Sequence, residues 1–285
     1  MAVTGILLMA SGVEAASPHT VPARRAKGTG SLTTSSMFST SLGHDVQLVV
    51  YLPPDYSPST TLYPVLYLLH GLPGSGPSMV QALDLQSQVD SLIDSKAIQP
   101  MIIVAPSDGP TRDTDTEWIN SRTNPSARWG TFVSSDLVRW VEDNFSVCST
   151  RSGTAIGGLS MGAFGAISNA LRHLSEYGAV TLWSPYFVSN TPLVDGPVGS
   201  SSWLADSPLL NLPTLVTALR AEPLRISIYV GTSDEFYAQT VQFVHELSRY
   251  KLKRRFSAYD AGHSYRLWRS ELATQLKWLS AGEHC

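Results

Sequence analysis

A serine between two glycines gives this sequence its strongest chemical signal. The stretch Gly158-Leu159-Ser160-Met161-Gly162 follows a short apolar run, 153–157, that predicts a β-strand, and it precedes 163–171, where small and apolar residues predict a helix. A Gly-x-Ser-x-Gly pattern between a strand and a helix is typical of the nucleophile elbow, a tight turn that exposes the serine hydroxyl. Glycine is needed two residues either side because larger side chains would collide with neighbouring backbone. The N–H groups at the helix N-terminus would stabilise developing negative charge.

Two further side chains follow predicted strands in the order that this chemistry requires. The β-rich run 225–231 leads to Asp234, and the last predicted strand, 256–260, leads to His263. The chain order Ser160, Asp234, His263 is that of α/β-hydrolases. Each side chain follows the C-terminal end of a strand, where open α/β sheets bind their ligands. We therefore predict that His263 takes the serine proton and that a carboxylate orients the imidazole.

Three carboxylates are candidates for this orienting role. Asp260 lies three residues before His263, and Glu235 follows Asp234 directly, so a one-residue shift of the loop would exchange those two. We favour Asp234 because of its position after a predicted strand, and the other two stay open as alternatives.

The oxyanion of a tetrahedral intermediate needs two N–H donors, and the sequence offers both. Met161 supplies one from the residue after the serine, and the loop after the third strand is expected to supply the other. The continuous apolar run 63–69 predicts a strand buried on both faces. In the loop that follows it, Leu72 has a backbone N–H to donate, whereas Pro73 has none. We predict Leu72 and Met161 as the donors, and we interpret His70 as a brace of this loop rather than a base.

Four segments together closely resemble the putative-esterase family: 51–56, 63–71, 158–162 and 262–264. That family includes esterase D (S-formylglutathione hydrolase), feruloyl and other carbohydrate acyl esterases, and the mycolyltransferase antigen 85 proteins. The likeness covers about residues 30–281. It implies an α/β-hydrolase fold and a serine carboxylesterase or acyltransferase mechanism. By position it implies the triad and the oxyanion donors Ser160, Asp234, His263, Leu72 and Met161.

The chain departs from the family pattern at three places. Ala163 replaces the second glycine usual after the elbow, a conservative change. His70-Gly71 stand where the mycolyltransferases carry Asp-Gly, which argues against that branch. The sequence also places no cysteine near the acyl pocket to suggest the glutathione-thioester branch.

The composition agrees with one enzyme domain that needs no cofactor. A chain of 285 residues fits a single α/β domain. Its formal net charge of -3 provides no basic field for nucleic acid. The basic run 251–255 is interpreted as a solvated helix end. No His, Cys or Asp cluster has metal-ligand spacing, so neither a metal nor a cofactor is expected.

The N-terminal segment has a different character. Residues 5–13 form a short apolar run, followed by the small-x-small site Val13-Glu14-Ala15. This pattern predicts a signal peptide over 1–16, too short to span a bilayer, although no Lys or Arg precedes Arg24. A flexible tether is expected over 17–30. We therefore expect a secreted or extracytoplasmic protein.

Cys148 and Cys285 are the two cysteines of the chain. In an exported protein they would be able to pair, tying the C-terminal tail to the end of the helix before the elbow strand. The alternative is that Cys148 is a buried free thiol and that Cys285 is a free thiol on a frayed C-terminus. Both interpretations stay open.

The remaining elements predict a doubly wound, mostly parallel sheet with helices on both faces, because strands alternate with helices. Strands are expected at 31–40, 45–52, 63–69, 100–105, 153–157, 180–183, 225–231 and 256–260, and helices at 79–95, 131–144, 163–171, 236–250 and 265–279. One α/β-hydrolase domain is expected over 31–285, with 188–222 as a possible lid.

Substrate choice is expected in the loops over the strand ends. The polar segment 107–128 carries Trp118, and Trp183 follows the next strand, so both are candidate substrate contacts. The leading hypothesis is an exported serine carboxylesterase that acts on a small-molecule or carbohydrate-linked ester. The alternatives are an acyltransferase that moves the acyl group to a sugar hydroxyl and, more remotely, a non-catalytic binding module. The oligomeric state is left open.

Overall fold

The computed structural model describes residues 28–109, 111, 114–189, 191, 194, 196–282 and 285. Within these residues an eight-stranded sheet forms the centre of the molecule. From edge to edge its strands are β1 (Ser31–Ser39), β2 (His44–Leu52), β4 (Ile102–Pro106), β3 (Val65–Leu69), β5 (Thr154–Leu159), β6 (Ala179–Trp183), β7 (Arg225–Gly231) and β8 (Arg255–Tyr259). The pairs β1–β2 and β2–β4 are antiparallel, and every pair from β4 to β8 is parallel. The predicted mostly parallel sheet is confirmed.

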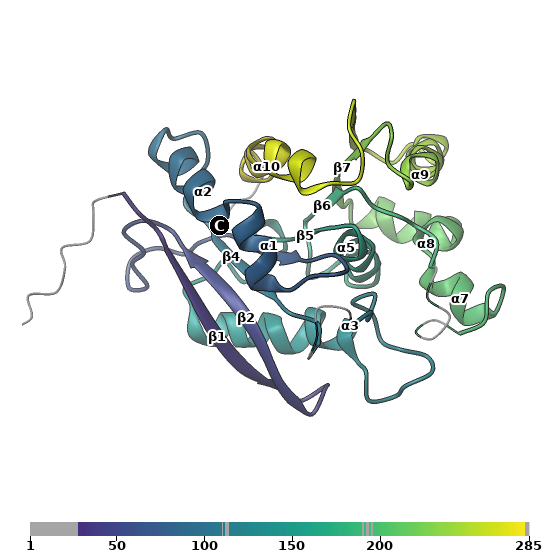
Figure 1. Cartoon of the computed structure of the whole chain (residues 1–285), viewed down its shortest axis with the longest axis horizontal. Helices are drawn as coiled ribbons and strands as arrows, with labels where there is room; N and C mark the ends of the chain where they lie inside the picture. The colour runs from purple at the N-terminus through teal and green to yellow at the C-terminus, as the bar shows by residue number, and fades with distance from the viewer. Residues whose placement is uncertain are drawn as a thin grey trace, which may run out of the picture.

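Helices cover both faces of this sheet (Figure 1). One face carries α1 (Gly76–Ala82), α2 (Leu85–Asp94) and α10 (Tyr265–Ser280), and the other carries α4 (Leu137–Asn144), α5 (Met161–Arg172), α8 (Pro208–Ala221) and α9 (Tyr237–Arg249). The buried apolar side chains accordingly form two clusters, one on each side of the sheet. None of the helices in the described part of the chain is both long and apolar enough to cross a membrane.

The single helix predicted over 79–95 is in fact two helices. Asp84 has left-handed backbone, with a φ of 51°, and separates α1 from α2. Leu83 and Leu85 lie on either side of it, and both are buried, at 0% and 1% exposure. In one continuous helix, residues two positions apart would point about 200° apart. The break therefore lets both leucines reach the same core.

Two helices also begin earlier than their apolar pattern predicts. Ser75 and Ser78 form a capping box that starts α1. The helix predicted over 131–144 begins with α3 (Trp129–Thr131) and continues through a π-helical turn, Phe132–Asp136, into α4.

The fold begins slightly before the predicted domain boundary. Residues 1–27, which include the predicted signal peptide, lie outside the described residues. Gly30, assigned to the tether, is fixed instead: its N–H donates to Asp90 Oδ1 at 3.0 Å, and its carbonyl accepts from Gln86 Nε2 at 2.8 Å. At the other end, Cys148 and Cys285 form a disulfide, with Cα atoms 5.3 Å apart, so the pairing left open by the sequence is present.

The segment predicted as a possible lid is largely helical in its described part. It contains α7 (Ser201–Asp206) and α8, and Leu209, Leu212 and Leu219 of α8 are buried in the core that α5 shares. The second half of the segment is thus part of the packed domain. Lid movement of 188–222 stays a prediction.

The topology brings six loops to one edge of the sheet. Because β3 to β8 run parallel, the loops that follow their C-terminal ends meet there. These loops carry residues 70–76, 107–128, 160, 184–191, 232–236 and 260–264.

Candidate active site

Ser160 occupies a strained turn between β5 and α5. Its backbone has φ 55° and ψ −121°, a combination that non-glycine residues rarely adopt. A Cβ atom at Gly158 would overlap the backbone of Gly162, and one at Gly162 would overlap the carbonyl oxygen of Leu69. The two glycines therefore let the elbow pack directly against β3, as expected from the sequence.

The structure brings the three predicted polar side chains into one line. His263 Nε2 lies 2.9 Å from Ser160 Oγ, and His263 Nδ1 lies 2.9 Å from Asp234 Oδ2. Since a carboxylate only accepts, Nδ1–H donates to Asp234, and Nε2 is left to accept the serine proton. The Asp234 side chain is fully buried, whereas that of His263 is 24% exposed, so a reactant can reach the imidazole but not the carboxylate.

Neither alternative acid makes this contact. Asp260 and Glu235 are both exposed, and the partner of His263 Nδ1 is Asp234. Of the three, the carboxylate after β7 is the one that contacts His263, and its role in catalysis stays a prediction.

Several donors hold Asp234 in its ionised form. Burial raises the pKa of the Asp234 carboxyl group, but the hydrogen bonds that it accepts outweigh burial and leave the pKa below its usual range. Besides His263, the donors are the Phe236 N–H, at 2.9 Å from Oδ1, and the Ser184 hydroxyl. Ser184 in turn accepts the Nε1–H of Trp268 at 3.0 Å. These contacts of Ser184, Phe236 and Trp268 were not predicted from the sequence; for Ser184 the one available signal was its place directly after β6.

Two aromatic rings hold the imidazole. The rings of Phe236 and Trp268 make edge contacts with His263, with centroids 5.3 Å and 4.9 Å away. These contacts restrict the ring to the orientation in which both nitrogens find their partners.

The predicted oxyanion donors lie around the serine. Met161 is the first residue of α5, and the first N–H groups of a helix have no partner within the helix. On the other side, a Cβ atom at Gly71 would lie 2.9 Å from Ser160 Cβ, so the loop that carries Leu72 passes directly beside the nucleophile. Met161 and the loop that carries Leu72 thus adjoin Ser160, and the role of their N–H groups as oxyanion donors stays a prediction.

His70 braces the oxyanion loop from inside. It is completely buried, its Nδ1 lies 2.9 Å from the carbonyl oxygen of Gly71, and its Nε2 lies 3.2 Å from Asp108 Oδ1. Trp118 Nε1–H donates to the His70 carbonyl at 3.1 Å. This geometry agrees with the structural role interpreted from the sequence.

The family model described as "Putative esterase" matches residues 39–279, most of the chain. The chain belongs to this esterase family. The resemblance drawn from the four sequence segments is therefore confirmed.

Individual proteins that this esterase-family chain resembles are also esterases or serine hydrolases. Esterase Rv1288 of Mycobacterium tuberculosis (strain ATCC 25618 / H37Rv) is 34% identical over 145 residues, an alignment that covers 50% of this chain and only 30% of that protein's length. Among solved structures, a ferulic acid esterase has a TM-score of 0.78 at 25% identity and covers 89% of this chain and 99% of its own. A fluorophosphonate-binding serine hydrolase of Staphylococcus aureus has a TM-score of 0.76 at 20% identity, with coverages of 89% and 99%. These likenesses confirm the α/β-hydrolase fold.

The substrate contacts predicted for Trp118 and Trp183 are wrong. Both side chains of this esterase are fully buried, at 0% exposure. Trp118 packs its Cβ against Gly165 of α5 while its indole supports the oxyanion loop. Trp183 points into the opposite core and donates its Nε1–H to Thr181 Oγ1 at 2.9 Å. Aromatic residues near strand ends suit core packing as well as ligand binding, and here they serve packing.

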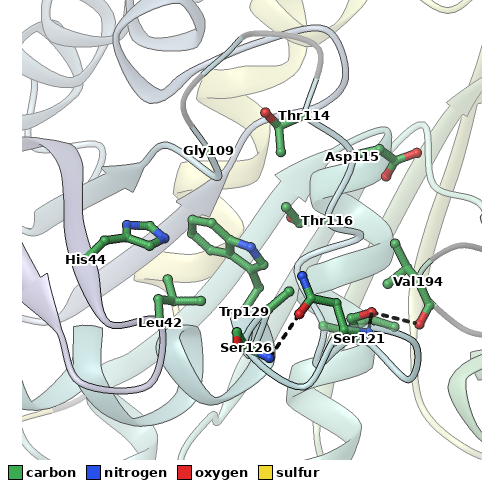
Figure 2. A pocket seen from close by; sticks show the side chains of 13 residues that line it. Leu42, His44, Gly109, Thr114, Asp115, Thr116, Ser121, Ser126, Trp129 and Val194 are labelled. Atoms are coloured by element: carbon green, nitrogen blue, oxygen red, sulfur yellow. Dashed lines mark hydrogen bonds between the residues drawn. The ribbon is translucent and has the colours of Figure 1, made fainter.

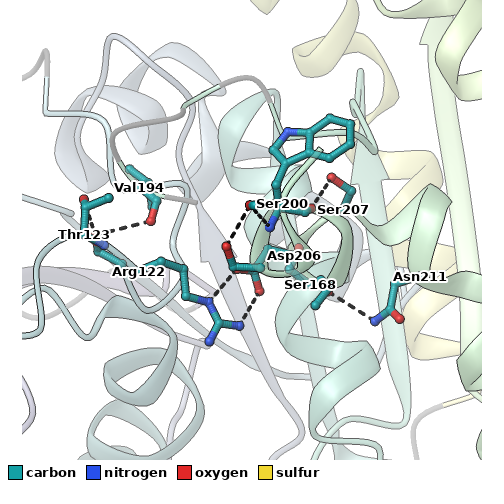
Figure 3. A network of polar contacts seen from close by, with 12 residues as sticks. Arg122, Thr123, Ser168, Val194, Ser200, Asp206, Ser207 and Asn211 are labelled. Atoms are coloured by element: carbon teal, nitrogen blue, oxygen red, sulfur yellow. Dashed lines mark hydrogen bonds and ion pairs between the residues drawn. The ribbon is translucent and has the colours of Figure 1, made fainter. Parts of the chain in front are cut away.

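A buried carboxylate ties the loop 107–128 to two helices of the esterase (Figure 3). Asp206, at the end of α7, accepts two hydrogen bonds from the Arg122 guanidinium at 2.7 and 2.9 Å. It also accepts one from Arg172 of α5 at 2.5 Å. Asp206 is 2% exposed, so hydrogen bonds from the two arginines replace those that water would make to its carboxylate.

Asp206→Asn is expected to lower the free energy of unfolding by about 1–3 kcal/mol, the range for hydrogen bonds to charged groups. The two arginines are partly exposed, at 48% and 34%, and can turn to solvent, which keeps the loss below that of a fully buried pair. Urea unfolding measures the change. Asp84→Asn is the matched control, because its pair with Arg269 is exposed and should contribute at most about 0.5 kcal/mol. Equal losses of unfolding free energy in the two variants would contradict a stabilising role for the hydrogen bonds between Asp206 and the two arginines.

A cavity of about 420 Å³ lies beside the loop 107–128 (Figure 2). Trp129 provides an apolar surface, and His44, Thr114, Asp115, Ser121 and Asn124 provide polar groups around it. Burial raises the pKa of the Asp115 carboxyl group. A second depression, of about 470 Å³, shares Trp129 and His44 with the first and reaches Gly74 and Ser75 of the oxyanion loop.

Among the residues that the structure describes, no group of three or more His, Cys, Asp or Glu side chains is arranged to hold a metal ion.

Proposed function

We propose that this chain is a secreted serine carboxylesterase that hydrolyses its substrate through an acyl-enzyme on Ser160. The observation that carries the proposal is the unbroken line of hydrogen bonds from Ser160 Oγ through His263 to Asp234, at 2.9 Å each. This line supplies a nucleophile, a general base and a fixed tautomer.

Acylation follows from the geometry of this line. Ser160 Oγ attacks the ester carbonyl carbon while His263 Nε2 takes its proton, and the buried Asp234 carboxylate stabilises the resulting imidazolium. The carbonyl oxygen, now negatively charged, accepts hydrogen bonds from the backbone N–H groups of Leu72 and Met161. The C–O bond to the alcohol then breaks, and the imidazolium gives its proton to the leaving oxygen.

Deacylation repeats these steps with water. His263 takes a proton from a water molecule, whose oxygen attacks the acyl carbon in the same oxyanion site. The bond to Ser160 Oγ breaks, the serine recovers its proton from the imidazolium, and the carboxylic acid leaves. A sugar hydroxyl in place of water would make the enzyme an acyltransferase.

A small-molecule or carbohydrate-linked ester is the proposed substrate class. Two neighbouring depressions share the indole of Trp129, and one of them reaches Gly74 and Ser75; together they present hydroxyl, amide and carboxylate groups, a lining suited to a polyhydroxy alcohol. The likeness to a ferulic acid esterase also supports tests with aromatic acyl groups.

Export is supported by two features. The first is the signal-like pattern over 1–16. The second is the Cys148–Cys285 disulfide, because disulfides persist in oxidising compartments.

Burst kinetics with p-nitrophenyl acetate test the proposal. We expect a rapid release of one equivalent of p-nitrophenol followed by slower turnover, and stoichiometric labelling of Ser160 by a fluorophosphonate probe. Added trehalose or another polyol should leave acetate as the main product; an acetylated polyol would establish the transferase instead. Methyl ferulate and acetylated xylan, assayed in parallel, rank the substrate classes. A folded protein with neither turnover nor labelling would overturn the enzyme proposal.

A further inference from the structure

A carboxylate that the mechanism does not use is completely buried near the site. Glu117 is 0% exposed, and it and Trp118 have left-handed backbone, with φ values of 51° and 55°. Such conformations are unfavourable for non-glycine residues and persist where the surroundings impose them. The Glu117 carboxylate accepts hydrogen bonds from the hydroxyl of Tyr186 and from that of Thr191, the latter at 2.6 Å. It thereby joins the loop after β4 to the loop after β6.

Tyr186 lies between this carboxylate and the triad. It is 5% exposed, and its ring stacks on Phe164 with centroids 4.9 Å apart and planes 14° apart. It also contacts Phe236 at a centroid distance of 5.0 Å. The Phe164 N–H bonds the Ser160 carbonyl at 3.1 Å, so one neighbour of Tyr186 belongs to the elbow itself.

Phe236 holds both of the other triad members. Its N–H donates to Asp234 Oδ1 at 2.9 Å, and its ring makes an edge contact with the imidazole of His263 at 5.3 Å. A displacement of Phe236 would therefore disturb the carboxylate and the base together.

Ring contacts alone do not fix such an arrangement. Aromatic pairs are weakly directional and tolerate sliding, whereas a hydrogen bond to a carboxylate is short and directional. The Tyr186 hydroxyl has its partner on the side of Glu117, which sets the rotation and the depth of the ring.

We propose that the Glu117–Tyr186 pair is a positioning device, which through Phe236 fixes the imidazole of the triad. The inference rests on the proposed hydrolase function. Neither residue takes part in proton transfer. Their effect is on geometry, where a misplacement of about 1 Å can cost about 10²-fold in rate.

The test compares Tyr186→Phe, Glu117→Gln and the double variant with the wild-type enzyme. With p-nitrophenyl acetate, Tyr186→Phe is expected to lower kcat about tenfold with KM within about twofold, because orientation of the base is lost and binding is kept. Because the two residues act as a unit, the double variant should be no slower than the slower single variant.

The matched control is Tyr177→Phe. Tyr177 is also buried and its hydroxyl also donates one hydrogen bond, to the Val133 carbonyl at 3.1 Å, in the helical layer away from the triad. This variant should lose stability in urea while keeping its kcat.

Three results would overturn the inference: an unchanged kcat in Tyr186→Phe, equal kcat losses in the two tyrosine variants, or multiplied losses in the double variant. Since Tyr186→Phe keeps the ring, it provides the test even if Glu117→Gln does not fold. Wild-type burst kinetics and labelling of Ser160 establish the hydrolase independently, so a failure here is distinct from a failure of the proposed function.

Discussion

Ser160→Ala is expected to lower kcat for ester hydrolysis by about 10⁴–10⁶-fold while leaving the protein folded. The alanine has no oxygen to attack the carbonyl, and the remaining imidazole cannot form the acyl-enzyme. Residual hydrolysis would come from the oxyanion donors and from substrate binding alone. The hydroxyl makes one hydrogen bond, to a partly exposed imidazole, so the free energy of unfolding should change by about 1 kcal/mol or less.

The measurements are steady-state hydrolysis of p-nitrophenyl acetate, fluorophosphonate labelling and urea unfolding. Ser168→Ala is the matched control, since Ser168 is also a buried serine and lies within α5, the helix that begins directly after Ser160. It should retain both labelling and turnover. Wild-type activity in Ser160→Ala would refute the assignment of the nucleophile.

The elements that position the triad could be predicted because their signals are local. The elbow pattern at 158–162, the apolar strands before Asp234 and His263, and the loop after 63–69 each span a few consecutive residues. Parallel strands place the residues after their C-terminal ends at one edge, so the chain order was enough to bring the three side chains together.

What escaped prediction depends on contacts between distant segments. The break at Asp84 follows from two leucines that must reach one core, which no window of helical periodicity reveals. Trp118 packs against α5 because Gly165, which has no side chain, leaves room for it there. Likewise, Glu117 meets Tyr186 only once the sheet has brought their two loops together.

Asp234→Asn is expected to lower kcat by about 10⁴-fold, the second large effect. The amide would be able to donate to Nδ1, which would leave the proton on Nε2 and give Ser160 a donor where it needs an acceptor. Asparagine has the same size as aspartate, so the substitution leaves no cavity. The loss of kcat would therefore result from the changed tautomer of His263. Asp260→Asn and Glu235→Gln are the matched controls and should retain wild-type kcat, because both side chains are exposed and apart from the imidazole. A large loss of kcat in Glu235→Gln, with none in Asp234→Asn, would show that Glu235 and not Asp234 is the triad acid.

The same substitution should change how stability depends on pH. The hydrogen bonds to Asp234 hold the pKa of its carboxyl group below the value of about 3.9 expected in the unfolded chain. A group whose pKa is lowered by folding stabilises the native state above its unfolded pKa, and that contribution disappears as the pH falls through the folded pKa. The contribution of the Asp234 carboxylate, measured as the unfolding free energy of the wild-type protein minus that of Asp234→Asn, should therefore shrink as the pH falls below about 4. Urea unfolding at a series of pH values measures it, and a difference that grows in acid would mean that the carboxylate is not stabilised by its neighbours.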